Sequence, residues 1–145
     1  MDFTGTGENY LTYTNCLLAE NGDVWLYHSR GYNPPRRVSY DNGVFSSRIY
    51  PEGFDGLPDT RVRFICEDAG QRIWIGTQQG LALYEEGEIT VLDTDRSYLH
   101  WIDDQVGTVY LVTRDNQIMR YNGTGRLQQA ARLDTYPGTR PTGAL

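Results

Sequence analysis

The sequence predicts an all-β fold built from many short strands, and three observations support this prediction. Glycine accounts for 16 of the 145 residues, and tyrosine and tryptophan account for 11 and 3. Glycine permits tight turns, whereas aromatic residues favour pleated, half-buried strands. Apolar segments centred on an aromatic residue recur along the chain, each preceded by an acidic turn that contains glycine. Short strands separated by such turns are typical of all-β domains.

The charge balance excludes one class of function. The chain carries 13 basic and 19 acidic residues, which gives a net charge of −6, and all 13 basic residues are arginine. A protein that binds nucleic acid regardless of its sequence needs a basic surface, so we expect no nucleic-acid partner. The longest apolar runs are only a few residues, and the sequence therefore predicts no transmembrane helix.

The residues that most often carry chemistry are few. Cys16 and Cys66 adjoin apolar residues and are interpreted as small buried hydrophobic side chains, with a single disulfide as the alternative. His28 and His100 lie far apart and the sequence has no Cys-x-x-Cys pair, so we expect no metal site and no cofactor. No nucleophile motif occurs, and adjacent acidic residues point to opposite faces of a strand. We therefore predict no catalytic residues.

Three segments of the chain share one plan. Each has an apolar pair, an acidic turn with glycine, and an apolar strand whose central residue is Trp25, Trp74 or Tyr110. We expect these central side chains to fill the space between neighbouring structural units. The segments are residues 17–27, 65–77 and 101–113.

A further strand follows in each copy and ends in a turn that contains glycine. This glycine lies 13 positions after the central aromatic residue in copies two and three, and 18 positions after it in copy one. The five extra residues coincide with an insertion around residues 32–35. The central aromatic residues are separated by 49 and 36 positions, which is close to the period of a β-propeller blade. The sequence therefore predicts about three four-stranded antiparallel blades, which form a partial β-propeller.

The repeat also predicts the limits of the blades. They are expected at approximately residues 10–50, 51–95 and 96–135, with residues 136–145 as a flexible tail or a closing strand. Residues 127–133 are either a short helix or the outer strand of the last copy. Closed propellers have about 4–8 blades. We therefore expect either a homo-oligomer whose copies complete a ring or further blades supplied by a parent receptor.

The second copy resembles the two-component-regulator propeller repeat. The resemblance extends from Gly56-Leu57-Pro58 through Glu67-Asp68 to Trp74-Ile75-Gly76-Thr77 and Gly80-Leu81. It implies a periplasmic sensory region of hybrid two-component systems or related bacterial receptors, in which propellers bind a ligand that is often an oligosaccharide. The sequence contains no kinase, nucleotide-binding or cyclase motif, so the resemblance implies one piece of such a sensor. Membrane contact would then occur only through segments of the parent receptor.

Candidate ligand contacts lie in the loops that this blade plan brings to one face. These loops supply Tyr, Arg and Gln, which are residue types that stack on sugars and hydrogen-bond to their hydroxyl groups. The alternative interpretation is a solvated polar rim. The candidate residues are Arg30, Tyr32, Arg61, Gln78, Gln79 and Arg114.

The sequence thus favours a non-enzymatic, ligand-sensing propeller segment of a bacterial two-component-type receptor, located in the periplasm. The expected partners are a carbohydrate or another small molecule. One alternative is a propeller lyase or hydrolase similar to streptogramin lyase, in which a histidine base and Mg²⁺ ligands are expected. The other alternative is an assembly scaffold whose loops contact only protein. Fold alone does not distinguish these functions.

Overall fold

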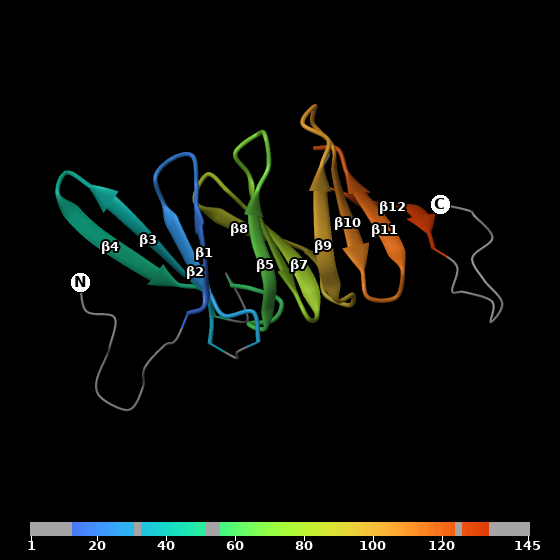
Figure 1. Cartoon of the computed structure of the whole chain (residues 1–145), viewed down its shortest axis with the longest axis horizontal. Coiled ribbons are helices and arrows are strands. Elements are labelled where there is room, and N and C mark those ends of the chain that lie inside the picture. Colours follow the sequence, from blue (N-terminus) through green and yellow to red (C-terminus); the bar gives the residue numbers. More distant parts are fainter. Residues whose placement is uncertain (1–12, 31–32, 52–55, 124–125, 134–145) are drawn as a thin grey trace.

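The computed structural model describes residues 13–30, 33–51, 56–123 and 126–133. These residues form twelve strands, which are arranged in three four-stranded antiparallel sheets (Figure 1). The sheets lie side by side along the longest axis of the molecule. The chain is therefore an all-β, partial β-propeller, as the sequence predicts, and we refer to the sheets as blades 1, 2 and 3.

Each blade is a meander in which consecutive strands pair. Blade 1 consists of β1 (Asn15–Leu18), β2 (Val24–Tyr27), β3 (Arg36–Asp41) and β4 (Val44–Ile49). Blade 2 consists of β5 (Val62–Glu67), β6 (Ile73–Thr77), β7 (Gly80–Glu85) and β8 (Glu88–Asp93). Blade 3 consists of β9 (Tyr98–Asp103), β10 (Val109–Thr113), β11 (Gln117–Tyr121) and β12 (Leu127–Arg132).

The meander separates the connections onto two ends of the molecule. The β2–β3, β6–β7 and β10–β11 loops lie at the lower end in Figure 1, together with the connections that lead from blade 1 to blade 2 and from blade 2 to blade 3. We call this end the loop face. The opposite end carries the β1–β2, β5–β6 and β9–β10 turns and is called the turn face. The predicted grouping of the loops on one face is confirmed for the described residues.

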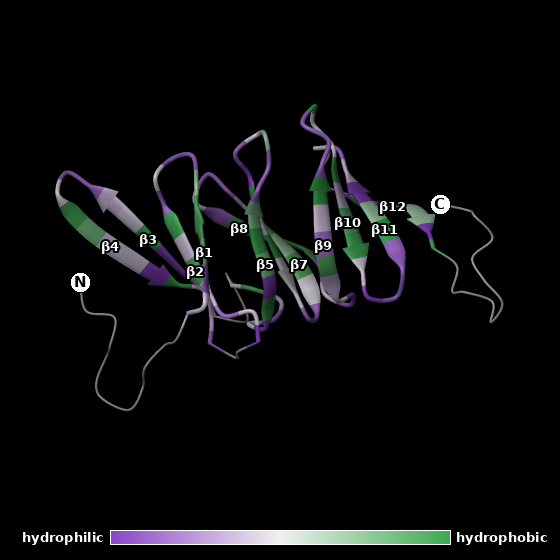
Figure 2. Cartoon of the chain, viewed as in Figure 1, coloured by the Kyte–Doolittle hydropathy of each residue, from purple (hydrophilic) through white to green (hydrophobic). Residues whose placement is uncertain are grey.

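Two hydrophobic cores hold the blades together. Trp25 is completely buried between blades 1 and 2, where its ring packs edge-on against Tyr84 at a centroid distance of 4.8 Å. Trp74 is completely buried between blades 2 and 3, and its ring packs against Tyr121 at 5.0 Å. Figure 2 shows hydrophobic residues on strands of every blade, whereas hydrophilic residues predominate in the turns. The central aromatic residues of copies one and two therefore fill the spaces between blades, as predicted.

Tyr110, the central aromatic residue of copy three, is only half-buried. It alternates along β10 with Val109 and Leu111, which are completely buried in the core shared with blade 2. Successive residues of a strand point to opposite faces of the sheet. Tyr110 therefore lies on the face of blade 3 that points away from blade 2.

Gly76 of the Trp-Ile-Gly-Thr sequence is required by close packing. It pairs with Phe64 across β5 and β6, and a Cβ atom at this position would overlap the Phe64 ring. Glycine thus leaves the space in which the ring packs, and this contact explains the small residue near the end of an otherwise bulky strand.

The five extra residues of copy one lie in two places. Only some of them lie in the β2–β3 connection, where the sequence predicts the whole insertion at residues 32–35. Trp25 pairs with Arg37, twelve positions further on, whereas Trp74 pairs with Leu83, nine positions further on. Three of the five extra residues therefore lie in the β2–β3 connection. The other two lengthen the β3–β4 hairpin, in which the turn glycine Gly43 lies six positions after Arg37. In blade 2 the corresponding distance is four positions, because Gly87 follows Leu83 by four.

Two further expectations have definite outcomes. Residues 127–132 form a strand, so the outer-strand alternative for this stretch is confirmed. The burial expected for both cysteines is correct for Cys66 and wrong for Cys16, and neither forms a disulfide. Cys16 is exposed because it pairs with Leu26 on the face of blade 1 that points away from blade 2. Residues 136–145, expected as a tail or a closing strand, lie outside the described residues.

Candidate functional site

Backbone hydrogen bonds hold the connections of the loop face together. The Gln78 N–H donates to the Arg61 carbonyl oxygen at 2.9 Å, and the Arg114 N–H donates to the Ser97 carbonyl oxygen at 2.8 Å. These two bonds are equivalent, because each joins the loop between the second and third strands of a blade to the segment that enters its first strand. The loops therefore have a defined arrangement on a rigid scaffold.

The residue at the end of the second strand shapes each of these loops. Thr77 Oγ1 accepts a hydrogen bond from the Gln79 N–H and donates one to the Gly80 carbonyl oxygen. Thr113 Oγ1 accepts a hydrogen bond of 3.0 Å from the Gln117 N–H. In blade 1 the same position is occupied by His28, whose Nδ1 accepts a hydrogen bond of 3.1 Å from the Arg30 N–H. His28 thus performs the structural role of the threonines.

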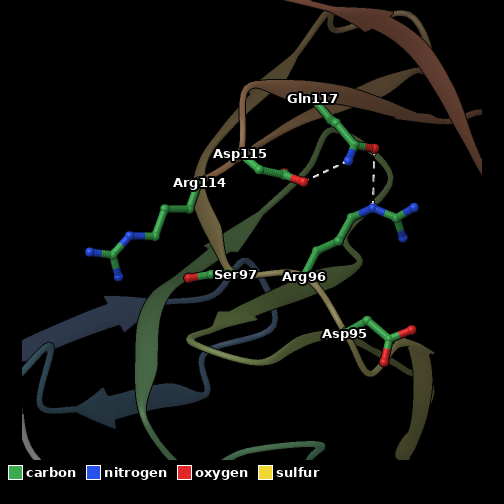
Figure 3. Close-up of a pocket in the computed structure, with 6 residues that line it drawn as sticks. All are labelled: Asp95, Arg96, Ser97, Arg114, Asp115 and Gln117. Atoms are coloured by element: carbon green, nitrogen blue, oxygen red, sulfur yellow. Dashed lines mark hydrogen bonds between the residues drawn. The ribbon is translucent and has the colours of Figure 1, made fainter.

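A solvent-open cavity of about 470 Å³ lies at the junction of blades 2 and 3 on the loop face (Figure 3). Its lining side chains are all polar and come from the β8–β9 connection and the β10–β11 loop with its adjoining residue. They are Asp95, Arg96, Ser97, Arg114, Asp115 and Gln117. The Ser97 hydroxyl oxygen is buried and has no hydrogen-bond partner among the described residues. Two arginines and two aspartates give the cavity both donors and acceptors.

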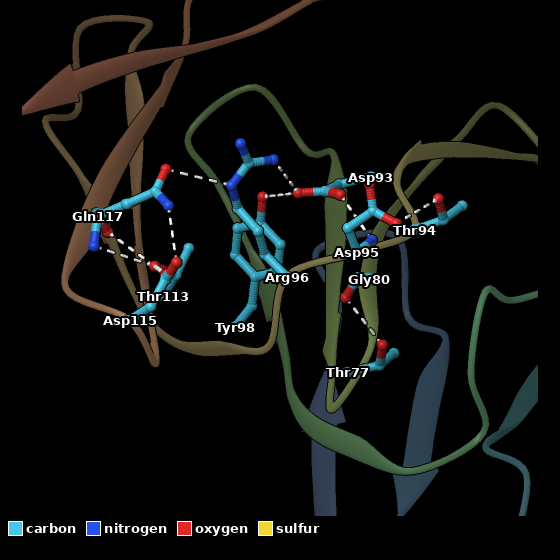
Figure 4. Close-up of polar contacts among 10 residues, drawn as sticks. All are labelled: Thr77, Gly80, Asp93, Thr94, Asp95, Arg96, Tyr98, Thr113, Asp115 and Gln117. Atoms are coloured by element: carbon cyan, nitrogen blue, oxygen red, sulfur yellow. Dashed lines mark hydrogen bonds and ion pairs between the residues drawn. The ribbon is translucent and has the colours of Figure 1, made fainter.

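Arg96 is held in place by a hydrogen-bonded network (Figure 4). Its Nη1 forms an ion pair of 2.9 Å with Asp93 Oδ2, and its Nε donates to Gln117 Oε1 at 3.2 Å. Asp93 also accepts a hydrogen bond from the hydroxyl group of Tyr98. The hydrogen bond to Asp93 raises the pKa of Arg96 despite partial desolvation. The guanidinium group is therefore a positioned, permanently charged donor at the wall of the cavity.

Asp115 is an ionised acceptor on the opposite side of the cavity. It accepts hydrogen bonds from the hydroxyl group of Thr113 and, at 2.7 Å, from Nε2 of Gln117. These bonds lower the pKa of the exposed Asp115 carboxyl. Arg114 is exposed, and its side chain points away from Arg96 in Figure 3. The cavity thus presents a cation at its rim beside a fixed carboxylate.

The structure places the six predicted ligand residues in different surroundings. Arg114 lines the cavity, whereas Arg61 pairs with the buried Asp59, with an Nη2–Oδ2 distance of 2.7 Å. Arg61 and Gln78 are brought together by their backbone bond, and Gln79 is exposed in the same tight turn. The remaining two are Arg30, exposed in the loop of blade 1, and Tyr32, which lies outside the described residues.

Five lining residues were missed by the sequence analysis. Asp115 belongs to a loop that the blade plan already identifies, and Gln117 follows that loop. The other three are Asp95, Arg96 and Ser97, in the segment that enters the first strand of blade 3. This segment is equivalent to residues 58–61, which enter the first strand of blade 2. Applying the same rule to the third copy would have found it.

The remaining side chains that could bind a metal or act as a nucleophile form no second site among the described residues. Among the described ranges, no three His, Cys, Asp or Glu side chains are grouped so that they could hold a metal ion. Burial, together with the nearby carboxylates of Asp68 and Asp103, raises the pKa of the Cys66 thiol, so this group stays protonated. None of the described residues forms a helix of the length and hydropathy needed to cross a membrane.

The second copy carries the decisive similarity. Residues 56–79, which include the Trp74 strand and the loop-face segment around Arg61, match the family model of the two component regulator propeller. Residues 56–79 are thus similar to a two component regulator propeller repeat. The match confirms the resemblance seen in the sequence and covers the whole of strands β5 and β6 together with the segment that leads into them.

Three solved structures illustrate the fold that surrounds this repeat. The extracellular domain of BT4673 from B. thetaiotaomicron has a TM-score of 0.66 and 19% identity, over 90% of this chain and 20% of that chain. The extracellular domain of BT3049 from B. thetaiotaomicron, described as a hybrid two component system, has a TM-score of 0.60 and 22% identity over 87% and 16% of the two chains. A streptogramin B lyase has a TM-score of 0.62 and 16% identity over 94% and 45%.

These likenesses support the propeller fold. The chain spans a fifth or less of the two extracellular domains and less than half of the lyase. No sequence among curated proteins matches the chain.

Proposed function

We propose that the chain is a ligand-sensing segment of the propeller region of a bacterial two-component-type receptor, that it works in the periplasm, and that it does not catalyse a reaction. The two component regulator propeller repeat at residues 56–79 supports the receptor class. The fold shared with extracellular domains of B. thetaiotaomicron supports the location outside the cytoplasm. Ligand binding would shift the packing of neighbouring modules and in this way reach a distant output domain.

The observation that carries the sensing proposal is the polar cavity between blades 2 and 3. Arg114 and Asp115 line it with exposed side chains, so a donor and an acceptor are accessible to a ligand in the cavity. Arg96 is already oriented by Asp93 and Gln117, so binding requires little further ordering of its side chain.

The lining favours an uncharged, polyhydroxylated ligand. Each hydroxyl group of a sugar both donates and accepts, so it can bind to an arginine and an aspartate in turn. The two arginines and two aspartates of the cavity balance each other in formal charge, which gives no preference for an anion or a cation. An oligosaccharide is therefore the ligand class that we propose.

The test is calorimetric titration of the chain with neutral oligosaccharides and, for comparison, with oligosaccharides of uronic acids. We expect a neutral oligosaccharide to bind, and Arg114→Ala and Asp115→Ala each to weaken the binding by about tenfold, the effect of losing one hydrogen bond to a charged group. Arg30→Ala is the matched control, since Arg30 lies on a loop of the same face outside the cavity. Binding that survives both cavity substitutions, or no binding at all, would contradict the proposal.

An enzymatic function is the second candidate, and the fold shared with streptogramin B lyase favours it. Incubation of the chain with a streptogramin B antibiotic, with and without added Mg²⁺, separates the two proposals. Ligand sensing predicts that the antibiotic remains intact in both samples. Turnover that requires Mg²⁺ would support the lyase instead.

A further inference from the structure

The outward faces of blades 1 and 3 carry exposed apolar side chains. On blade 1 the face that points away from blade 2 includes Leu18, which is 71% exposed, and the contacting rings of Tyr40 and Phe45. On blade 3 the face that points away from blade 2 includes Ile102, which is 58% exposed, and its pairing partner Tyr110. Apolar surface of this kind is typical of a protein–protein contact.

These two faces are the two halves of one interface, which the chain already forms twice. Each blade presents its central aromatic residue to the next blade, so that Trp25 packs on blade 2 and Trp74 packs on blade 3. The receiving side uses the apolar residues that flank the central aromatic residue of the next blade. Tyr110 therefore belongs to a presenting face, and Val24 and Leu26 of blade 1 belong to a receiving face. A presenting face and a receiving face already pack against each other at both interfaces within the chain, so their shapes are complementary.

A hydrogen bond from a backbone amide to a side-chain carboxylate of the next blade lies at the turn-face edge of each internal interface. The Glu20 N–H of the blade 1 turn donates to Glu67 Oε1 of blade 2 at 2.9 Å. The Ala69 N–H of the blade 2 turn donates to Asp103 Oδ2 of blade 3 at 2.7 Å. The equivalent amide of blade 3, that of Gln105, donates within its own blade to Asp103 Oδ1 at 2.8 Å.

Among the residues that the structure describes, the two outward faces lack the amide-to-carboxylate hydrogen bond that marks the internal interfaces at this edge. The position of Glu67 and Asp103 is occupied in blade 1 by Leu18, which cannot accept the amide hydrogen bond. The residue that follows the Gln105 amide is Val106, which is 85% exposed. On blade 1 the acceptor is thus replaced by an apolar residue, and on blade 3 the amide is already satisfied within its own blade, so these two faces can pack together without the polar contact.

We propose that the outward face of blade 3 packs on the outward face of blade 1 of a second copy of this chain, head to tail, with Ile102 against Leu18. Such a contact uses different surfaces of the two copies, so it closes a ring only when both ends are satisfied. Two copies bring six blades together, which is within the range of about 4–8 for closed propellers.

Light scattering coupled to size exclusion tests this contact. We expect the chain to elute with a mass of two copies of its 16.5 kDa, and Leu18→Asp and Ile102→Asp each to give a single-chain mass. Both residues are exposed, so the substitutions should leave the blades folded. Val91→Asp is the matched control: Val91 is exposed on the middle blade and should tolerate the change without loss of mass.

Mixing the two variants distinguishes a head-to-tail contact from the pairing of like faces. The Leu18→Asp chain keeps its blade 3 face, and the Ile102→Asp chain keeps its blade 1 face. An equimolar mixture should therefore recover a two-chain species held by one intact contact. A single-chain mass for the unsubstituted chain would overturn the proposal. So would an assembly that only one of the substitutions dissociates, because this result indicates that like faces pair.

The two cysteines give a second, independent measurement. Cys16 lies on the outward face of blade 1 and would be covered in the assembly, whereas Cys66 is buried in every state. We expect the rate of alkylation of Cys16 to fall as the chain concentration rises, and to be independent of concentration in Leu18→Asp. A Cys16 rate that does not depend on concentration in either chain would overturn the contact.

Discussion

The indole Nε1–H of Trp74 donates a hydrogen bond of 2.9 Å to Oδ2 of Asp68, and both residues are buried. The same carboxylate oxygen accepts a hydrogen bond of 2.7 Å from Nε of Arg72. One side chain thus joins the β5–β6 turn to the aromatic residue that fills the space between blades 2 and 3. In blade 1 the position of Asp68 is occupied by Ala19, and the buried Nε1 of Trp25 has no partner among the described residues.

Replacing Asp68 should strongly destabilise the fold. We expect Asp68→Ala to lower the free energy of unfolding by about 3–5 kcal/mol, because it leaves a nearly buried Arg72 charge and the Trp74 N–H without their acceptor. Urea unfolding followed by tryptophan fluorescence measures the change. Asp104→Ala is the control at the same position of blade 3, where the exposed carboxylate accepts from turn amides and contacts neither a buried arginine nor an indole. Equal losses in the two variants would contradict the role assigned to Asp68.

Supplying an acceptor to Trp25 should stabilise the chain. Ala19→Asn places an amide oxygen where Asp68 stands in blade 2, and a cavity of about 260 Å³ lined by Ala19 and Trp25 leaves room for it. We expect a gain of about 1 kcal/mol in the free energy of unfolding, the net contribution of one hydrogen bond. Ala19→Leu adds similar bulk without an acceptor and should give no gain. A gain of the same size in both variants would indicate packing rather than hydrogen bonding.

A methyl group at Gly76 should disturb the core between blades 2 and 3. We expect Gly76→Ala to lower the free energy of unfolding by about 1–3 kcal/mol, because the Phe64 ring must move away from the new Cβ atom. Thermal unfolding monitored by circular dichroism measures the loss. Phe64→Leu in the Gly76→Ala background should recover part of it. Gly70→Ala is the control, since a Cβ there meets its neighbours only at 3.4 Å or more. A similar loss in both glycine variants would show that the Phe64 contact is not the cause.

The stability of the loop-face network should fall in acid. Burial acts to raise the pKa of Asp93, but hydrogen bonds from Tyr98, the Asp95 amide and Arg96 outweigh it, so the pKa lies below its ordinary value of 3.8. A carboxyl group of this kind stabilises the fold above its unfolded pKa and loses that contribution as the pH falls through the folded pKa.

We therefore expect the difference in free energy of unfolding between the unsubstituted chain and Asp93→Asn to shrink as the pH is lowered from neutral to below 3.8. Urea unfolding at a series of pH values measures this difference. Tyr98→Phe removes one donor to the carboxylate and should reduce the pH dependence in the same direction. A difference that stays constant over the whole range would contradict the assignment.

The blades could be predicted because their information is local. In each copy an acidic turn that contains glycine is followed within a few positions by a strand with a central aromatic residue. The exposure of Cys16 could not be predicted in this way, since an apolar strand residue has the same pattern whether its face is covered or open. The cavity could not be predicted either, because Arg96 and the β10–β11 loop meet only through the packing of two blades.

The longer hairpin of blade 1 illustrates how such repeats tolerate changes of length during evolution. Two extra residues on each arm of the β3–β4 hairpin leave Tyr40 on the same side of its sheet as Tyr84 in blade 2, because side-chain direction in a strand repeats every second residue. A single extra residue would turn every later side chain of the strand to the wrong side unless a β-bulge absorbs it, as happens at the register shifts of blades 2 and 3. Changes of length within these hairpins are therefore expected either in even numbers or together with a β-bulge, whereas the loops accept odd numbers directly, as with the three residues between β2 and β3.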